Sequence, residues 1–278
     1  MARQNIYDNE VFFEGYQQIR AKEGNANVLF EMPALFSMLP DLNGKTVLDL
    51  GCGFGEHCMY FAKKGAIKVV GIDISEKMLK VAKTENGAQN IIYHRMAMEN
   101  ISELDEYFDV VISSLAFHYV EDFKKLIQDC FDLLKPGGVL IFSQEHPFSS
   151  AFGEGRELAE MHGKVNGENE KEAKTAFFEC PRERWTKDEN GRKLYVNLAN
   201  YGIEGERKSK WFVEGVQKYH RTFSTIFNDL AQTGFFVEKV EEPLPTPDIL
   251  EKYPEQADLF HKPDFLVIKA RKVERRRN

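Results

Sequence analysis

The sequence lacks any long apolar run. No stretch reaches the roughly 18 consecutive apolar residues that a membrane-spanning helix requires. The first ten residues, MARQNIYDNE, also lack the apolar core of a secretion signal. We therefore expect a cytoplasmic protein with no membrane partner.

Cysteine is scarce, and its spacing is not that of a metal site. No CxxC pair occurs, and no histidine stands at ligand spacing from the four cysteines, which are Cys52, Cys58, Cys130 and Cys180. We expect reduced, mostly buried thiols and no bound metal.

Positive charge is in deficit, because 37 lysines and arginines face 44 aspartates and glutamates and leave a net charge of −7. A general nucleic-acid binder needs a basic excess to neutralise phosphates, so no nucleic-acid partner is expected. The tail at residues 274–278 is locally basic. It either contacts an acidic partner or forms a solvated, frayed end.

Short apolar runs alternate with amphipathic stretches between residues 46 and 145, and no internal repeat interrupts them. This alternation predicts an α/β fold, with a Rossmann-like, doubly wound, mostly parallel sheet of seven strands. The two last strands, at 235–243 and 264–273, are expected to pair antiparallel at the sheet edge. The five other strands are expected within 46–50, 68–73, 90–98, 108–115 and 139–145. The intervening helices are expected at 56–64, 76–83 and 123–135.

The remaining segments suggest additions to this core. Residues 1–42 are expected to form a helical lid, and residues 147–217 an inserted substrate cap with two strands at 193–201 and 209–219. The core itself would comprise 43–146 and 218–273. The cap carries many large rings, which either shape an acceptor pocket or form a small satellite core.

Three glycines, Gly51, Gly53 and Gly55, stand between the first predicted strand and the first helix of the core. Glycine lets backbone approach a ligand closely, and free N–H groups at a helix start favour negative charge. Asp73 follows Gly51 by 22 residues, where a carboxylate can accept both hydroxyls of a ribose. The pattern predicts an adenosine-containing cofactor, unless Asp73 only caps a turn.

The glycine spacing also narrows the choice of cofactor. It is GxGxG, and the third glycine of the dinucleotide pattern GxGxxG is missing. Glu56 at the helix start would repel a pyrophosphate. The site therefore suits a cofactor without phosphates.

Several motifs in order resemble those of the class I S-adenosylmethionine-dependent methyltransferases. They are VLDLGCGFG, VVGIDIS, RMAMEN, FDVVISSLAFHYVED and LLKPGGVLIFS, and the resemblance spans about 43–145. It implies S-adenosyl-L-methionine as cofactor and methyl transfer to O, N or C of a small molecule. The base-modifying members often carry an Asn/Asp-Pro-Pro-Tyr motif and the arginine-modifying members paired glutamates, and neither occurs here.

The resemblance implies roles by position. Asp49 would orient the amino group of the cofactor, Asp73 would hold its ribose, and Glu99 would accept from its adenine amine. The full set of implied cofactor-binding residues is Tyr16, Arg20, Asp49, Gly51, Cys52, Gly53, Gly55, Asp73, Ile74, Met78, Ala97, Met98, Glu99, Ser114 and Leu115. Met98 and Tyr16 are equally compatible with core packing, and Arg20 with a surface ion pair.

His118 follows the fourth strand, close to where the methyl group would emerge, and is the candidate catalytic residue. Packing is the alternative, and a general base is optional because it depends on the acceptor's pKa. The candidate substrate residues are His146, Trp185, Trp211, Tyr219, His220 and Arg221.

Two other functions stay open at this point. One is a nicotinamide-dependent oxidoreductase, against which the missing glycine and the closing strand pair argue. The other is a non-catalytic protein that binds the same cofactor. The chain is expected to act as a monomer or a homodimer.

Overall fold

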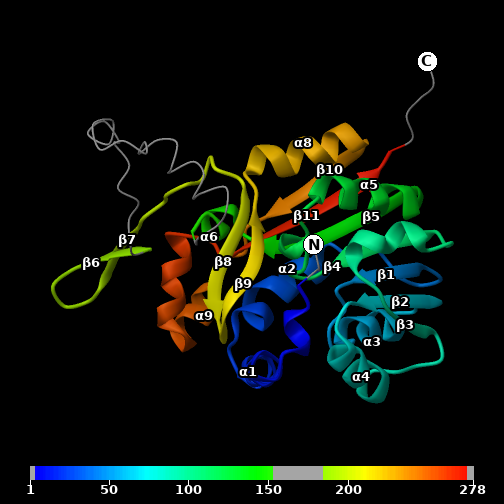
Figure 1. Cartoon of the computed structure of the whole chain (residues 1–278), viewed down its shortest axis with the longest axis horizontal. Helices are drawn as coiled ribbons and strands as arrows, with labels where there is room; N and C mark the ends of the chain where they lie inside the picture. The colour runs from blue at the N-terminus through cyan, green and yellow to red at the C-terminus, as the bar shows by residue number, and fades with distance from the viewer. Residues whose placement is uncertain (1–3, 153–183, 274–278) are drawn as a thin grey trace.

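A seven-stranded sheet forms the centre of the computed structural model, which describes residues 4–152 and 184–273. The strand order is β10-β11-β5-β4-β1-β2-β3 (Figure 1). The strands are β1 Thr46–Leu50, β2 Lys68–Asp73, β3 Ile91–Arg95, β4 Phe108–Ser113, β5 Leu134–Glu145, β10 Phe235–Glu241 and β11 Phe265–Lys272. The pairs from β5 through β4, β1 and β2 to β3 are parallel, whereas β11 is antiparallel to both β5 and β10. The predicted fold class and the antiparallel closing pair are confirmed.

Helices cover both faces of the sheet, as the apolar strands require. They are α3 Glu56–Lys63, α4 Glu76–Glu85, α5 Phe123–Leu133 and α8 Phe223–Thr233. Successive residues of β1 point to opposite faces, so Leu48 and Leu50 pack with α5 and α8, while Val47 packs with α3. Figure 1 shows α5 and α8 on one side, and α3 with α4 on the other. This layering leaves the strand ends free to form a site.

The N-terminal segment is helical, as predicted. It comprises the 3-10 turn η1 Ile6–Asp8, α1 Glu10–Ala21, the π-helical turn η2 Asn27–Glu31 and α2 Met32–Ser37. The side chain of Asn9 caps α1 by accepting from the backbone N–H of Phe12. Within the described residues, no helix is long and apolar enough to cross a membrane.

The strand prediction inside the insertion was wrong in detail. β7 Lys193–Val196 pairs with β6 Trp185–Lys187, and β8 Gly205–Trp211 pairs with β9 Val213–His220. The stretch 209–219 is therefore not one strand. It contains the end of β8, the hairpin turn and most of β9, and Phe212 takes a left-handed φ of 57° in the turn between Trp211 and Val213. The expected boundary between 217 and 218 falls inside β9. Residues 153–183, with Cys180, and the tail 274–278 lie outside the described residues.

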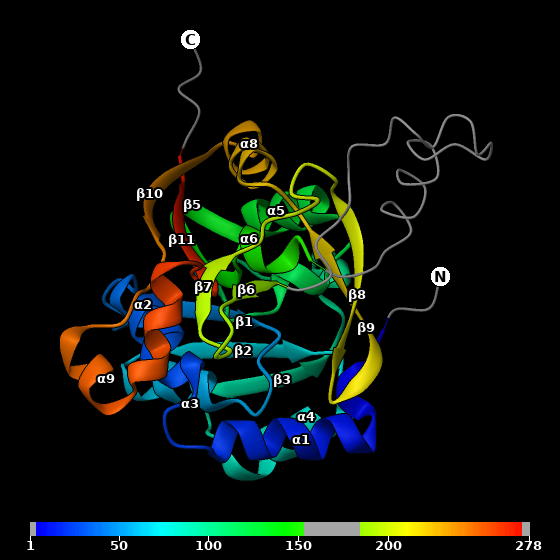
Figure 2. The same cartoon turned by 90° about the vertical axis from the view of Figure 1, so that its left-hand side faces the viewer.

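The hairpin of β8 and β9 packs against the N-terminal segment (Figure 2). The ring of Phe12 meets that of Trp211 edge-on at 5.2 Å, and Gly15 lies directly against Phe212. The amide of Gln4 donates to the carbonyl of Gly215 and accepts from the N–H of Gln217. Segments about 200 residues apart in sequence are thus joined.

Short elements complete the chain. They are η3 Met98–Glu103, η4 Phe117–Tyr119, α6 Pro147–Ser150, α9 Pro247–Lys252 and η6 Pro254–Phe260. The last two lie between the closing strands β10 and β11. In both, a proline stands in the first turn, where a backbone N–H would have no hydrogen-bond partner within the helix.

Candidate active site

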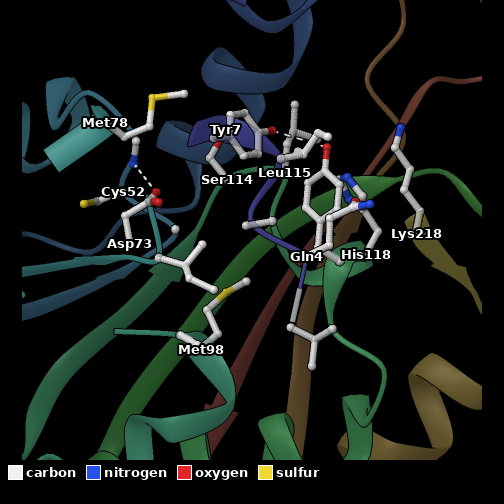
Figure 3. A pocket seen from close by; sticks show the side chains of 18 of the residues that line it. Gln4, Tyr7, Cys52, Asp73, Met78, Met98, Ser114, Leu115, His118 and Lys218 are labelled. Carbon is white, nitrogen blue, oxygen red and sulfur yellow. Dashed lines mark hydrogen bonds between the residues drawn. The ribbon is translucent and has the colours of Figure 1, made fainter. Parts of the chain in front are cut away.

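A cavity of about 1020 Å³ opens at the carboxyl ends of the parallel strands. Its lining comes from the ends of β1, β2, β3 and β4, from the N-terminal segment and from β8 and β9. Figure 3 shows Cys52, Asp73, Met78 and Met98 on one side of it, and His118 and Lys218 on the other. Open α/β sheets bind ligands at this end of their strands.

The glycine bend after β1 forms one wall. Gly51 and Gly53 take left-handed φ angles of 72° and 53°, which glycine adopts without cost. A Cβ on Gly51 would stand 2.7 Å from the Cβ of Ala116, whereas one on Gly53 would meet nothing within 4 Å. Gly55 does not line the cavity and serves as the N-cap of α3.

Asp73 ends β2 at the edge of this bend. Its carboxylate accepts from the backbone N–H of Gly53 at 2.9 Å and from that of Ser75 at 2.8 Å. It therefore caps a turn and also lines the cavity. Burial raises the pKa of Asp73 to about 6.

An apolar slot continues from Asp73. Ile74 and Met78 line it from the segment after β2, and Ala97, Met98 and Glu99 line it from the segment after β3. Met78 is 1% exposed, and its backbone N–H donates to the N-cap residue Ser75. Apolar side chains predominate among these residues, as is usual in pockets that bind small ligands.

Asp49 does not reach the cavity. It is 1% exposed, and its carboxylate accepts from the thiol of Cys58 at 3.2 Å. Burial raises the pKa of Asp49 to about 7. The structure therefore does not bring this residue to the surface where the sequence motif suggested it.

The end of β4 forms the floor between the two halves. Ser114 and Leu115 line the cavity, and Leu115 takes a left-handed φ of 51°, which is rare for a residue with a side chain. The backbone N–H of Leu115 is held by both the carbonyl and the hydroxyl of Ser143. Backbone in this conformation persists where its surroundings fix it, commonly at functional sites.

The N-terminal segment contributes lining residues that sequence reasoning missed. The hydroxyl of Tyr7 lies 3.2 Å from that of Tyr119, the bond drawn from Tyr7 in Figure 3. Tyr16 and Arg20 of α1, which the sequence did single out, also line the cavity, and Arg20 forms the ion pair considered for it, with Glu56. Nothing in the local sequence around Tyr7 signals this contact, because its partner is 112 residues away.

The far half of the cavity carries His118, Trp211 and Tyr219, as well as an ion pair between Lys218 and Glu145 that the sequence did not reveal. Although burial alone would raise the pKa of Glu145, Lys218 and His118 hold it at about 2. The Lys218 ammonium also lies over the Trp211 ring, 5.3 Å from its centroid.

His118 is buried and uncharged near neutral pH. Burial lowers its pKa to about 4, and its Nδ1 accepts from the backbone N–H of Glu145 at 3.4 Å. In the neutral ring that accepts at Nδ1, the proton resides on Nε2. His118 can thus donate a hydrogen bond into the cavity.

Four candidate substrate residues lie away from the cavity. His146 bonds to Glu242, and Trp185 contacts His261 beyond the sheet end. His220 bonds to Ser150, and the guanidinium of Arg221 donates to the carbonyls of Val120 and Glu121. Each of these four side chains therefore makes contacts within the protein outside the cavity.

The comparisons with known proteins agree with this geometry. A family model described as a methyltransferase domain matches residues 48–142. The crystal structure of an S-adenosylmethionine-dependent methyltransferase from Mesorhizobium loti is 36% identical, with a TM-score of 0.70, over 87% of this chain and 97% of that one. The chain belongs to the class I S-adenosylmethionine-dependent methyltransferases.

Two further relatives extend the comparison. A Listeria monocytogenes structure, named as a proposed methyltransferase of this kind, is 40% identical with a TM-score of 0.73, over 88% of this chain and 97% of that one. The ubiquinone biosynthesis O-methyltransferase of Coxiella burnetii is 40% identical over 104 residues, which is 37% of this chain and 44% of that protein. The methyltransferase family assignment removes the nicotinamide-dependent alternative.

The cavity fits the cofactor of these methyltransferases, S-adenosylmethionine. The carboxylate at the end of β2, the glycine backbone and the apolar slot all belong to its lining. Among the described lining residues, the two lysine or arginine side chains, Arg20 and Lys218, each pair with a glutamate, so the cavity suits a cofactor without phosphates. Among the described residues, no group of three His, Cys, Asp or Glu side chains is placed to hold a metal ion.

Proposed function

We propose that this methyltransferase transfers a methyl group to a small molecule held in the far half of the cavity. The observation that carries the proposal is the continuity of the cavity. It runs from the glycine bend past Ser114 and Leu115 to His118 and Trp211, inside walls from the N-terminal segment and the hairpin. A volume of about 1020 Å³ suits a cofactor together with a compact acceptor.

In this proposal, Asp73 accepts hydrogen bonds from the ribose hydroxyls, and Gly51 and Gly53 offer backbone to the methionine portion. Ile74, Met78, Ala97 and Met98 pack on the adenine, and Glu99 accepts from its amine. Tyr16 and Arg20 cover the methionine end from α1. Each of these residues lines the cavity, which supports the assignment.

Bound S-adenosylmethionine supplies an electrophilic methyl group on a sulfonium. The residues of the chain then have to align an acceptor atom with that group, and alignment alone can supply roughly 7–11 kcal/mol of the barrier. His118, as an Nε2–H donor, would orient the acceptor rather than remove its proton. Trp211 and Tyr219 would stack on it.

The acceptor is proposed to be a small molecule rather than a nucleic acid, since the cavity is lined by Glu121, Glu145 and Glu206 against Lys218. The partial match to an O-methyltransferase of ubiquinone biosynthesis adds support for an acceptor of this size. The atom that receives the methyl group is left as O, N or C.

The test has two stages. Calorimetry with S-adenosylhomocysteine measures binding, and incubation with methyl-labelled cofactor and a bacterial metabolite extract measures transfer. We expect label in the small-molecule fraction, and less label with the Asp73→Ala variant when the cofactor is kept below saturation. Label only in the protein or nucleic-acid fraction would contradict the small-molecule acceptor, and binding without any transfer would favour a non-catalytic binder.

A further inference from the structure

Glu31, the last residue of the π-helical turn η2, is a fully buried acid with an unusual set of partners. Its side chain is 0% exposed, and one carboxylate oxygen accepts from the hydroxyls of Ser114, at 2.9 Å, and Ser143. The other oxygen, Oε2, is buried with no hydrogen-bond partner. Buried polar atoms almost always have a partner, so this one calls for an explanation.

Glu31 stands directly behind the cavity wall. Ser114 lines the cavity, and a single hydrogen bond separates its hydroxyl from the Glu31 carboxylate. Leu115, also in the wall, is held by the same Ser143 hydroxyl that donates to Glu31. Asn27, the first residue of the same π-helical turn, lines the cavity too. Isolated π-helical turns occur frequently at functional sites.

The charged groups around Glu31 do not supply a cation that is paired with its carboxylate. Arg20 attracts it, but that guanidinium already pairs with Glu56. Asp49 lies close enough for the two acids to repel each other, and the Glu31 charge also contributes, after burial, to the raised pKa of Tyr16. Burial raises the pKa of Glu31, although the hydrogen bonds from Ser143 and Ser114 and the charge of Arg20 act in the opposite direction. A cation entering this corner would relieve both carboxylates.

We propose that Glu31 binds the α-ammonium group of the cofactor, directly or through the Ser114 hydroxyl. The inference rests on the proposed function, since it concerns the same cavity. An ammonium group supplies what the corner lacks, namely a positive charge and hydrogen-bond donors. Glu31 thereby takes the role that the sequence motif suggested for Asp49. Neither carboxylate lines the cavity itself, but Glu31 is one hydrogen bond from the lining residue Ser114, whereas Asp49 accepts from the buried thiol of Cys58.

The test compares two ligands that differ only at the ammonium group. They are S-adenosylhomocysteine and its deaminated analogue, in which hydrogen replaces the α-ammonium. Calorimetry with the Glu31→Gln variant should show binding of S-adenosylhomocysteine weakened tenfold or more, and binding of the analogue unchanged within twofold. Glutamine keeps an oxygen that can accept from Ser114 and Ser143. The thermal unfolding midpoint of the Glu31→Gln variant should therefore not fall below that of the wild type.

Two variants serve as controls. Glu23→Gln removes an exposed carboxylate of the N-terminal region and should bind both ligands as the wild type does. Asp49→Asn tests the rival carboxylate and should not discriminate between the ligands. A selective loss with Asp49→Asn in place of Glu31→Gln would return the role to Asp49.

The remaining outcomes are also decisive. Unchanged affinity of Glu31→Gln for S-adenosylhomocysteine, or an equal loss for both ligands, would overturn the assignment and leave the proposed function standing. Wild-type protein that binds neither nucleoside would overturn both.

Discussion

The carboxylate of Asp73 accepts the backbone N–H of Gly53 at 2.9 Å, which fastens the end of β2 to the glycine bend after β1. The two sequence features that suggested a nucleoside site are therefore one physical unit. A change at either residue alters the backbone that faces the ligand as well as the side chain that binds it.

Replacing Asp73 tests this unit. Asp73→Ala should weaken binding of S-adenosylhomocysteine by about 1–3 kcal/mol, because charge-assisted hydrogen bonds are lost. Asp73→Asn, which keeps one acceptor oxygen, should lose less. Isothermal titration calorimetry of both variants gives the measurement, and normal binding by Asp73→Ala would refute the assignment of the ribose site.

A valine at Gly53 should abolish binding of the same ligand. The φ of 53° penalises any side chain by about 1–2 kcal/mol, and the new side chain would stand where the ligand approaches the backbone. Gly44→Val is the matched control, since Gly44 has a φ of 72°, equally open surroundings and no place in the cavity. Equal binding by the two variants would argue against close approach at Gly53.

The pH dependence of unfolding should carry the signature of Asp49. Its pKa is raised by burial from 3.8 to about 7, so the folded state holds this proton more tightly than the unfolded state. Its contribution to stability is complete below about pH 4 and is lost as the pH rises toward 7. Denaturant unfolding of the ligand-free protein should show that Asp49→Asn gains on the wild type across this range.

Asp109 should contribute to stability with the opposite pH dependence, which the Asp109→Asn variant tests. Hydrogen bonds from Lys135 and Thr46 outweigh burial and hold the pKa of Asp109 at about 2. That carboxylate contributes stability above about pH 4, which is lost as the pH falls toward 2. If the unfolding free energies of Asp49→Asn and Asp109→Asn depended on pH as that of the wild type does, the shifted pKa values of the two aspartates would be ruled out.

The ion pair between Lys218 and Glu145 should show strong coupling. Lys218→Met leaves the Glu145 charge without its partner in a largely buried place, at a cost of about 3 kcal/mol in the free energy of unfolding. The double variant with Glu145→Gln should recover most of that loss. Lys252→Met, which breaks an exposed pair with Glu23, should change stability little. Additive losses in the double variant would contradict coupling.

The sheet and the glycine-bend end of the cavity were predictable because their signals are local. Strands such as Thr46–Leu50 are short apolar runs, and the glycine bend and Asp73 stand at fixed positions after them. The strand order and the layers follow from general packing rules. The turn at Phe212 was missed because apolar residues continue through it on both sides, so the alternation resembles a single strand.

The half of the cavity around His118 and Lys218 was less predictable, because its contacts join distant parts of the chain. Tyr7 meets Tyr119, and Lys218 meets Glu145, with no local pattern to announce either pair. Histidine placement after a strand predicted the cavity lining for His118 but not for His146, which turns to Glu242. Glu31 did leave a signal, since it is an acid within the apolar stretch LFEMPALF.

The bridge that Gln4 makes to the backbone of Gly215 and Gln217 has a consequence for motion. Together with the contact of Phe12 and Trp211, it ties the N-terminal segment to the hairpin tip, so neither can swing outward alone. Amide hydrogens on α1 and on β9 should then exchange with deuterium at a common opening rate. We therefore expect the N-terminal segment and the hairpin to open together rather than as two independent flaps.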